Sequence, residues 1–170
     1  LNSCGYFAIG AAGKENSKVQ VNGTANLTGG KIIPMVEALP VPGIDYNYLN
    51  ASTIIGNVND NKINSVVTLT GSNNGSNASF RAVNAGLSNV AADTTPSERS
   101  VLRALNIKGE QYFKNAPASS ITDDLLPIYY SSDAGIKSAG TSLAAEGRTK
   151  LLQESALSYL SSKAVGDRLD

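Results

Sequence analysis

Residues 95–105 carry the sequence TPSERSVLRAL, which marks the point where strand patterns give way to helix patterns. Thr95 is a residue type that caps helix N-termini, Pro96 suits the first helical position, and Glu98 stands where a capping-box partner is expected. The apolar residues that follow at helical spacing are Val101, Leu102 and Leu105. The stretch therefore predicts a helix that starts at Pro96 and stops at Gly109.

Before this stretch, the chain has the patterns of strands and turns. Residues 17–21 (SKVQV) and 24–28 (TANLT) flank Asn22-Gly23, a dipeptide typical of a hairpin turn. Residues 31–39 are apolar enough for another strand, but Pro34 cannot donate a ladder hydrogen bond. We therefore expect an edge strand, a bulge or a bend there.

Further strands are expected between residues 45 and 83. Residues 45–49 should be extended, and residues 52–58 and 62–70 should flank a turn at Asn59-Asp60-Asn61. The segment 62–70 is the clearest half-buried strand, because Val67 and Leu69 alternate with threonines. The loop signal GSNNGSN covers residues 71–77, and a short strand is expected over 78–83.

The C-terminal part has two more helical patterns. Residues 121–130 predict a helical turn capped by Thr122 and broken by Pro127. Residues 142–165 predict one long helix, with Gly166 as its stop. Its apolar face should be buried in the same chain or against a partner, and it contains Leu152, Leu157 and Leu160.

These patterns together predict an α+β fold. A mostly antiparallel sheet from the N-terminal half would carry the C-terminal helices packed on one face. We expect an N-terminal tail over residues 1–16 and a single globular domain over 17–170, β-rich at 17–90 and helical at 95–166. The length of 170 residues fits one domain.

The composition argues against several classes of function. Fourteen basic residues balance fourteen acidic ones without a basic run, which argues against binding to nucleic acid or to anionic membranes. No apolar run approaches the roughly 20 residues of a transmembrane helix. Charged residues make up 16% of the chain, against about 25% in average proteins, so serine, threonine and asparagine must supply the polar surface.

The chain also lacks residues on which much enzyme chemistry depends. It has no histidine and one cysteine, which excludes histidine-based triads and structural zinc sites. Asp123 and Asp124 are adjacent, and neighbouring helical positions do not face each other as a glycosidase pair must. Residues 57–61 (NVNDN) resemble a calcium loop loosely and fit a turn better. We expect no metal and no cofactor.

A ligand site is one open hypothesis. Tyr46 and Tyr48 would share a face if residues 45–49 are extended, and with Asp45 they could stack on a sugar or anchor a protein. Tyr129-Tyr130 forms a second aromatic cluster. The competing interpretation, half-buried structural tyrosines, is the more frequent one.

Five asparagines lie in Asn-x-Ser/Thr triplets and are candidate glycan acceptors in a secreted protein. They are Asn22, Asn26, Asn50, Asn74 and Asn77. Such triplets also arise by chance in a chain rich in asparagine and serine, so these sites are hypotheses.

The sequence Leu1-Asn2-Ser3-Cys4-Gly5 resembles the lipobox of bacterial lipoproteins. Leu1 and Ser3 match that pattern, whereas Asn2 departs from it. The resemblance implies that Cys4 is diacylated and that the preceding residues are removed. Two acyl chains would give stable membrane anchoring.

We predict from these features a non-enzymatic extracellular or cell-envelope protein, either a structural subunit or an adhesion module of a surface assembly such as a fimbrium or filament. Its partners would be copies of itself or other envelope proteins. The apolar segment 5–13 could add a strand to a neighbouring subunit or pack on its own domain. The alternative is a periplasmic or secreted small-ligand or glycan-binding domain, or a histidine-free hydrolase.

Overall fold

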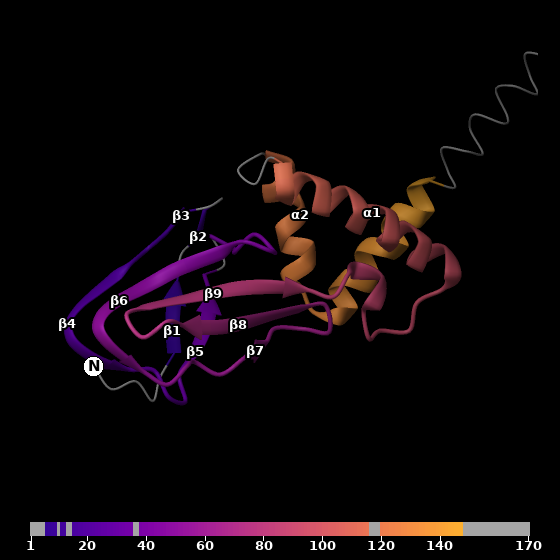
Figure 1. Ribbon diagram of the computed structural model, residues 1–170. Coiled ribbons are helices and arrows are strands. Elements are labelled where there is room, and N and C mark those ends of the chain that lie inside the picture. Colours follow the sequence, from indigo (N-terminus) through magenta and orange to yellow (C-terminus); the bar gives the residue numbers. More distant parts are fainter. Residues whose placement is uncertain (1–5, 10, 13–14, 36–37, 116–119, 148–170) are drawn as a thin grey trace, which may run out of the picture.

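The computed structural model describes residues 6–9, 11–12, 15–35, 38–115 and 120–147. Figure 1 shows two parts, a group of strands and a group of helices beyond one end of those strands. The strands come from the N-terminal half of the chain and the helices from the C-terminal half. The fold is α+β, as the change of pattern at residue 95 predicts.

A five-stranded sheet forms the centre of the strand group. Its order is β4 (Val19–Asn26), β6 (Asp45–Ile55), β9 (Asn77–Asn84), β8 (Val67–Asn73) and β7 (Asn61–Lys62). The pairing of β4 with β6 is parallel and the other three pairings are antiparallel. The sheet is therefore mixed but mostly antiparallel, as expected.

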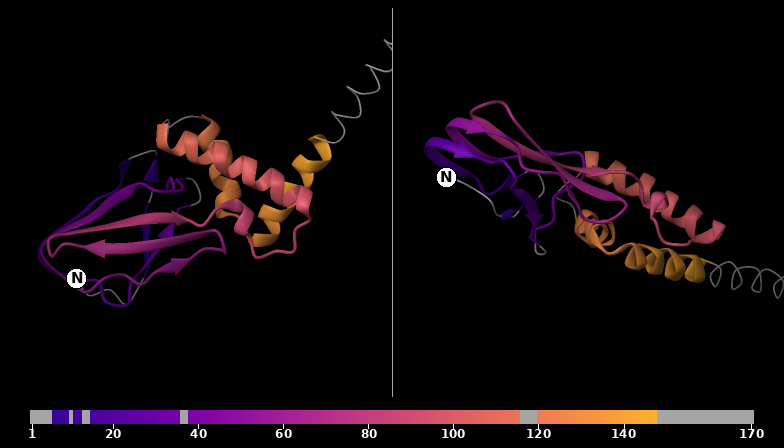
Figure 2. Two further views of the ribbon diagram at one scale, coloured as in Figure 1. Left: turned by 45° about the vertical axis from the view of Figure 1, so that its right-hand side comes forward. Right: turned by 90° about the horizontal axis from the view of Figure 1, so that it is seen from below.

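Two short strand pairs complete the strand group. β1 (Tyr6–Ile9) runs parallel to β5 (Lys31–Pro34), and β2 (Ala11–Ala12) pairs with β3 (Glu15–Asn16). Figures 1 and 2 show β1 and β5 as a second layer against one face of the sheet. The described residues of the predicted 1–16 tail thus pack on the domain.

The core lies between the sheet and this second layer and continues toward the helices. Tyr46 and Phe80 stack with ring centroids 5.2 Å apart, and Tyr48 lies 6.1 Å from the same ring. Other fully buried side chains surround them: Leu27, Ile32, Val41, Leu49, Leu69, Leu87, Leu102, Tyr129 and Ile136. One continuous cluster therefore joins strands and helices.

Three helices follow the short 3-10 turn η1 (Leu87–Asn89). They are α1 (Pro96–Asn115), α2 (Ser120–Tyr130) and a helix that covers residues 133–147. They pack against the sheet at the end where β9 finishes and β8 begins. There the Asn64 amide donates to the carbonyls of Tyr129 and Ser131, both at 2.7 Å, and the Asn106 Oδ1 accepts from the Leu87 N–H at 3.1 Å.

The predicted helix start at Pro96 is confirmed in detail. The Thr95 N–H donates to the Glu98 carboxylate at 2.7 Å, and the Glu98 N–H donates to the Thr95 hydroxyl at 3.3 Å. This is the reciprocal capping box that the spacing predicts. The Thr141 hydroxyl also donates to Glu98 from the helix over residues 133–147, so the capping box joins two helices.

The predicted hairpin at Asn22-Gly23 is wrong. β4 runs through both residues, and its register against β6 shifts between Val21 and Thr24. Gly23 has φ = 134°, a conformation that glycine adopts readily. The dipeptide forms a bulge because β4 keeps pairing with β6 on both sides of it.

Other strand boundaries also differ from the predictions. β6 unites the segments expected separately at 45–49 and 52–58, so residues 59–61 do not connect a hairpin of two long strands. The loop predicted at 71–77 narrows to residues 74–76, because β8 extends to Asn73. Asparagine side chains complete this turn, since Asn74 Oδ1 accepts from the Asn77 N–H at 2.8 Å.

The helix ends show the same effect of tertiary packing. α1 continues past Gly109 to Asn115, because Gly109 is buried where the Tyr129 ring crosses the helix. Pro127 lies inside α2 and does not break it. The helix expected from Ser142 already begins at residue 133, whereas the predicted buried face with Leu152, Leu157 and Leu160 lies outside the described residues.

The contact at Gly109 gives a test of this packing. A Cβ at position 109 would come within 2.5 Å of the Tyr129 hydroxyl, whereas a Cβ at Gly147 meets nothing within 4 Å. Gly109→Ala should therefore lower the free energy of unfolding, since overpacking costs about 1–3 kcal/mol and alanine returns about 1 kcal/mol of helix propensity. The matched Gly147→Ala should raise it by up to about 1 kcal/mol. Denaturant titration measures the unfolding free energies of both variants. A Gly109→Ala variant that is more stable than the wild type would contradict the close contact between Tyr129 and α1.

The capping box makes a second, pH-dependent prediction. The hydrogen bond from the Thr141 hydroxyl, and then those from Thr95, lower the pKa of Glu98 to about 2 from its ordinary 4.5. Because the folded-state pKa is lowered, the stabilisation is complete above pH 4.5 and is lost as the pH falls toward 2. Lys137 also favours the carboxylate.

Glu98→Gln keeps an acceptor for Thr95 but cannot titrate, so it is the matched variant. The unfolding free energy of the wild type should fall more steeply than that of Glu98→Gln between pH 4.5 and pH 2. Urea titrations at a series of pH values give both slopes. Parallel curves would show that Glu98 has an ordinary pKa in the folded protein.

Candidate functional site

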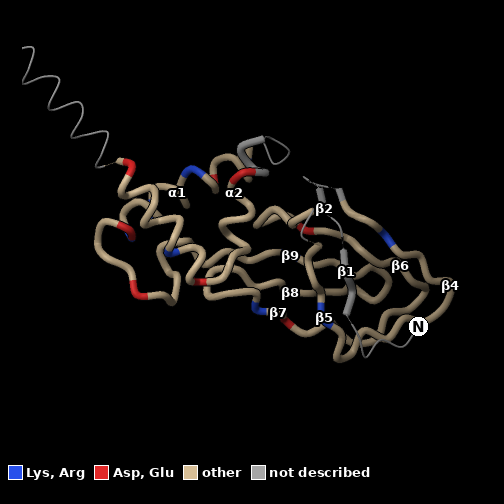
Figure 3. The backbone as a smooth tube through the Cα atoms, turned by 180° about the vertical axis from the view of Figure 1, so that it is seen from behind, with Lys and Arg blue, Asp and Glu red and all other residues tan. Residues whose placement is uncertain are grey.

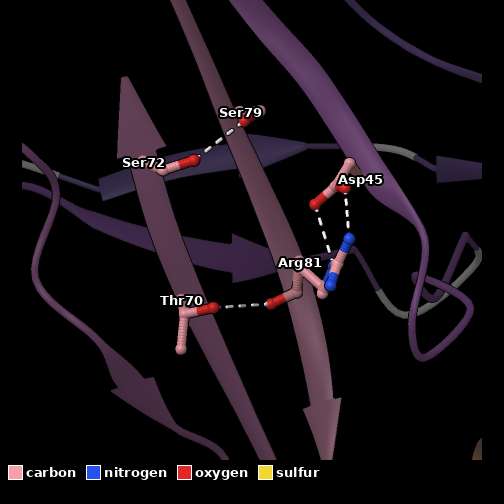
Figure 4. A network of polar contacts seen from close by, with 5 residues as sticks. All are labelled: Asp45, Thr70, Ser72, Ser79 and Arg81. Atoms are coloured by element: carbon pink, nitrogen blue, oxygen red, sulfur yellow. Dashed lines mark hydrogen bonds and ion pairs between the residues drawn. The ribbon is translucent and has the colours of Figure 1, made fainter. Parts of the chain in front are cut away.

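The sheet face opposite the core carries polar side chains in register. The strand pairings align these side chains in rows across the sheet. Each row runs from β6 to β9, and two of the rows continue to β8. We call this surface the polar outer face and define it by Asp45, Asn47, Asn50, Thr70, Ser72, Asn77, Ser79 and Arg81. Figure 4 shows five of these side chains on the same side of the strands.

One row contains the ion pair of the outer face. The Arg81 guanidinium binds both carboxylate oxygens of Asp45, with Nε 2.9 Å from Oδ1. The side chains are 48% and 59% exposed, so the pair adds little to stability. Its two charges compensate each other, and Figure 3 shows charged residues scattered along the chain.

The next row opens into a hollow of about 340 Å³ at the β8–β9 turn. It is lined by Asn47, Ser72, Asn73, Asn74, Asn77 and Ser79. The Ser72 and Ser79 hydroxyls share a hydrogen bond of 3.0 Å across the floor. Asn73 also lines the hollow, and its amide donates to the Gly56 carbonyl and to Asn57 Oδ1.

Asn47 has an unusual arrangement within this hollow. Its main-chain carbonyl accepts a hydrogen bond of 2.8 Å from the Asn16 amide, alongside the start of β6. Its side-chain Oδ1 is buried and has no hydrogen-bond partner among the described residues, and the same holds for Asn50. A buried acceptor without a partner carries a free-energy cost, so it is a reason to look for a ligand.

A second cavity lies between the sheet end and α1. This groove of about 550 Å³ has Ile44, Val83 and Phe113 as apolar lining, together with Arg81, Glu110 and Lys114. Charges of both signs border it, and Val83 is 45% exposed. The lining of the groove therefore does not favour one class of ligand, whether apolar, anionic or cationic.

The predicted tyrosine site is not formed. Tyr46 and Tyr48 do share a face, but that face is the core, and both rings are buried against Phe80. The Tyr46 hydroxyl accepts a hydrogen bond of 2.9 Å from the Val41 N–H, and burial raises the pKa of Tyr48 to about 12. Asp45 alone reaches the polar outer face.

Other sequence candidates also have structural roles. Tyr129 is buried, and the Tyr130 hydroxyl donates to the Pro40 carbonyl at 2.7 Å. In the segment that resembles a calcium loop, the Asn61 amide donates to the Ile32 carbonyl at 2.8 Å. The described residues contain no group of three or more acidic, cysteine or histidine side chains that could hold a metal.

The candidate glycan acceptors lie in different environments. Asn22 and Asn74 are exposed, and Asn26 Oδ1 accepts from the Thr28 N–H at 3.0 Å. Asn50 and Asn77 lie opposite each other on the polar outer face, and Asn50 Oδ1 is buried. Glycosylation at these positions stays a prediction.

Cys4 lies outside the described residues, so its lipidation stays a prediction. None of the described helices is long and apolar enough to cross a membrane. Comparison of the chain with protein families, with curated proteins and with solved structures finds no match in any of the three.

The hollow was missed by sequence reasoning, although part of its signal is present. Ser79 sits in a segment that alternates with apolar residues, which predicts an outward-facing side chain, whereas Ser72 falls in the loop predicted over residues 71–77. The bulge between Asn47 and Leu49 is needed to place Asn47 and Asn50 on the same outer face, and no local pattern predicts it. Asn47, which lies between the two tyrosines in the sequence, lines the hollow, whereas Tyr46 and Tyr48 are buried in the core.

Two neighbouring residues on β6 test the assignment of the two faces. Tyr46→Phe leaves the Val41 N–H without its acceptor and should cost about 1–3 kcal/mol of unfolding free energy. Asn47→Ala removes an unpaired acceptor and should change stability by less than about 0.5 kcal/mol or raise it. Denaturant midpoints measure both. An equal loss in the two variants would show that Asn47 has a structural hydrogen bond.

Proposed function

We propose that this chain is a non-enzymatic structural subunit or adhesion module of an extracellular or cell-envelope assembly, and that copies join by exchanging β1. The observation that carries the proposal is the attachment of β1. Four residues, Tyr6–Ile9, pair in parallel with β5 in the layer beside the five-stranded sheet. Exchange of an identical element between protomers is a low-cost route to association.

The geometry of β5 supports exchange. β5 is itself only four residues long, and among the described residues it has one further bridge, from Lys31 to Asn59. A second copy offers the same β5 in the same register, so β1 gains the same backbone hydrogen bonds in either chain. The difference in free energy between the closed and exchanged forms is therefore small.

The surface around β5 and the overall charge support association as well. Ile33 is 37% exposed and Met35 is 42% exposed, so apolar surface lies beside β1. The formal net charge is zero, which weakens repulsion between copies. Location outside the cytoplasm rests on the low charge, the Ser/Thr/Asn surface and the lipobox resemblance at Cys4.

Cysteine trapping between two single variants tests the exchange. Ala8 and Ile33 are register partners in β1 and β5, so one Cys4→Ser chain carries Ala8→Cys and a second carries Ile33→Cys. Neither chain can form an internal disulfide, because each has one cysteine. We expect a mixed disulfide dimer after the two are incubated together and oxidised, seen on non-reducing gels and by mass spectrometry.

The matched control replaces Ile33→Cys by Ile107→Cys, an exposed position on α1 with 52% exposure. It should give much less mixed dimer with Ala8→Cys. Removal of residues 1–13 should abolish self-association in size-exclusion chromatography. A full-length chain that stays monomeric at every concentration and gives no dimer above the control overturns the proposal.

A further inference from the structure

The hollow in the polar outer face has a uniform chemistry. Each of its six lining residues has an uncharged amide or hydroxyl: Asn47, Ser72, Asn73, Asn74, Asn77 and Ser79. The nearest charges in the register are Asp45 and Arg81, one row away, and they neutralise each other. The hollow therefore has no unbalanced charge to attract an ion and no apolar lining to attract a hydrocarbon.

Unused hydrogen-bonding groups surround the hollow. Asn47 lines the hollow, although its Oδ1 is itself buried. The bond between Ser72 and Ser79 uses one proton and one lone pair, so each hydroxyl keeps further capacity. Asn74 uses its Oδ1 for the N–H groups of Ser76 and Asn77, which leaves its amide protons for a ligand.

We infer that this hollow binds one neutral sugar ring. A sugar ring presents adjacent hydroxyls that both donate and accept, which matches the amide protons of Asn74 and the hydroxyls of Ser72 and Ser79. A cation finds no carboxylate in the lining, and an anion finds no cation.

The dimensions and the lining set the expected size and affinity of the ligand. The volume of about 340 Å³ is near the lower end of ligand pockets, which begin at about 300 Å³, so one ring fits better than a chain. No aromatic ring lines the hollow, because Tyr46 and Tyr48 point into the core. Without such stacking, we expect a Kd of about 1 mM.

The site belongs to a single copy of the chain. Its residues come from β6, β8, β9 and the β8–β9 turn, and Figure 4 shows Ser72 and Ser79 together on one side of the strands. Sugar binding therefore needs no exchange of β1, and either proposal can fail without the other.

Titration of the labelled full-length chain by two-dimensional NMR tests the site. The probes are D-glucose, D-galactose, D-mannose and N-acetyl-D-glucosamine, with glucuronate and glucosamine as charged counterparts. At least one neutral sugar should give saturable shifts at the hollow residues, and the charged sugars should bind more weakly. Asn47→Ala and Ser79→Ala should each weaken binding by at least about tenfold.

The matched control is Asn59→Ala, which removes an exposed amide that does not line the hollow. It should bind like the wild type. Thermal melting of each variant confirms that it is folded, and Ser79→Ala provides a second test at a different strand. The inference is overturned if no neutral sugar shifts the hollow residues, if the shifts persist in Asn47→Ala and Ser79→Ala, or if only a charged sugar binds.

Discussion

The stacking of Tyr46 on Phe80 decides which face of the sheet is the core. These residues are register partners on β6 and β9, and their ring centroids lie 5.2 Å apart. Because side chains alternate between faces, a one-residue slip of either strand would move its aromatic ring to the outer face and its charged neighbour, Asp45 or Arg81, to the core side. The polar outer face therefore exists because the aromatic pair occupies the other side.

Asparagine connects this sheet to the rest of the molecule. Asn64 Oδ1 accepts from the N–H groups of Val66 and Val67, while its amide donates to carbonyls at the end of α2. Asn106 joins α1 to the segment that follows β9. The side-chain amide of asparagine can both form turns and donate hydrogen bonds to backbone carbonyls. A chain with few charges can therefore still satisfy the hydrogen bonds of its buried backbone groups.

The two proposals place different functions on opposite faces. The β1–β5 layer would join copies, while the hollow on the polar outer face would contact a sugar (Figures 1 and 4). A millimolar site is weak alone, but many copies in one assembly would raise the avidity by about 10²–10⁴. This combination would give a low-affinity sugar site a use in adhesion.

The sequence by itself determined the features that depend on neighbours within a few residues. The capping box of Thr95 and Glu98, the start of α1 and the strand alternation around Val67 and Leu69 are all of this kind. The order of strands before helices followed from the same local patterns. Side-chain period and capping chemistry act over one turn of chain, so they can be recognised without the fold.

Only the tertiary structure decided the features whose partners are distant in sequence. Asn22-Gly23 is a bulge because β6 pairs along β4, and α1 passes through Gly109 because Tyr129 needs the space. Tyr46 and Tyr48 are core residues because both rings pack on Phe80, and the hollow combines residues of β6, β8 and β9. The register between strands and the contacts between side chains distant in sequence set these outcomes, and no local sequence pattern encodes either of them.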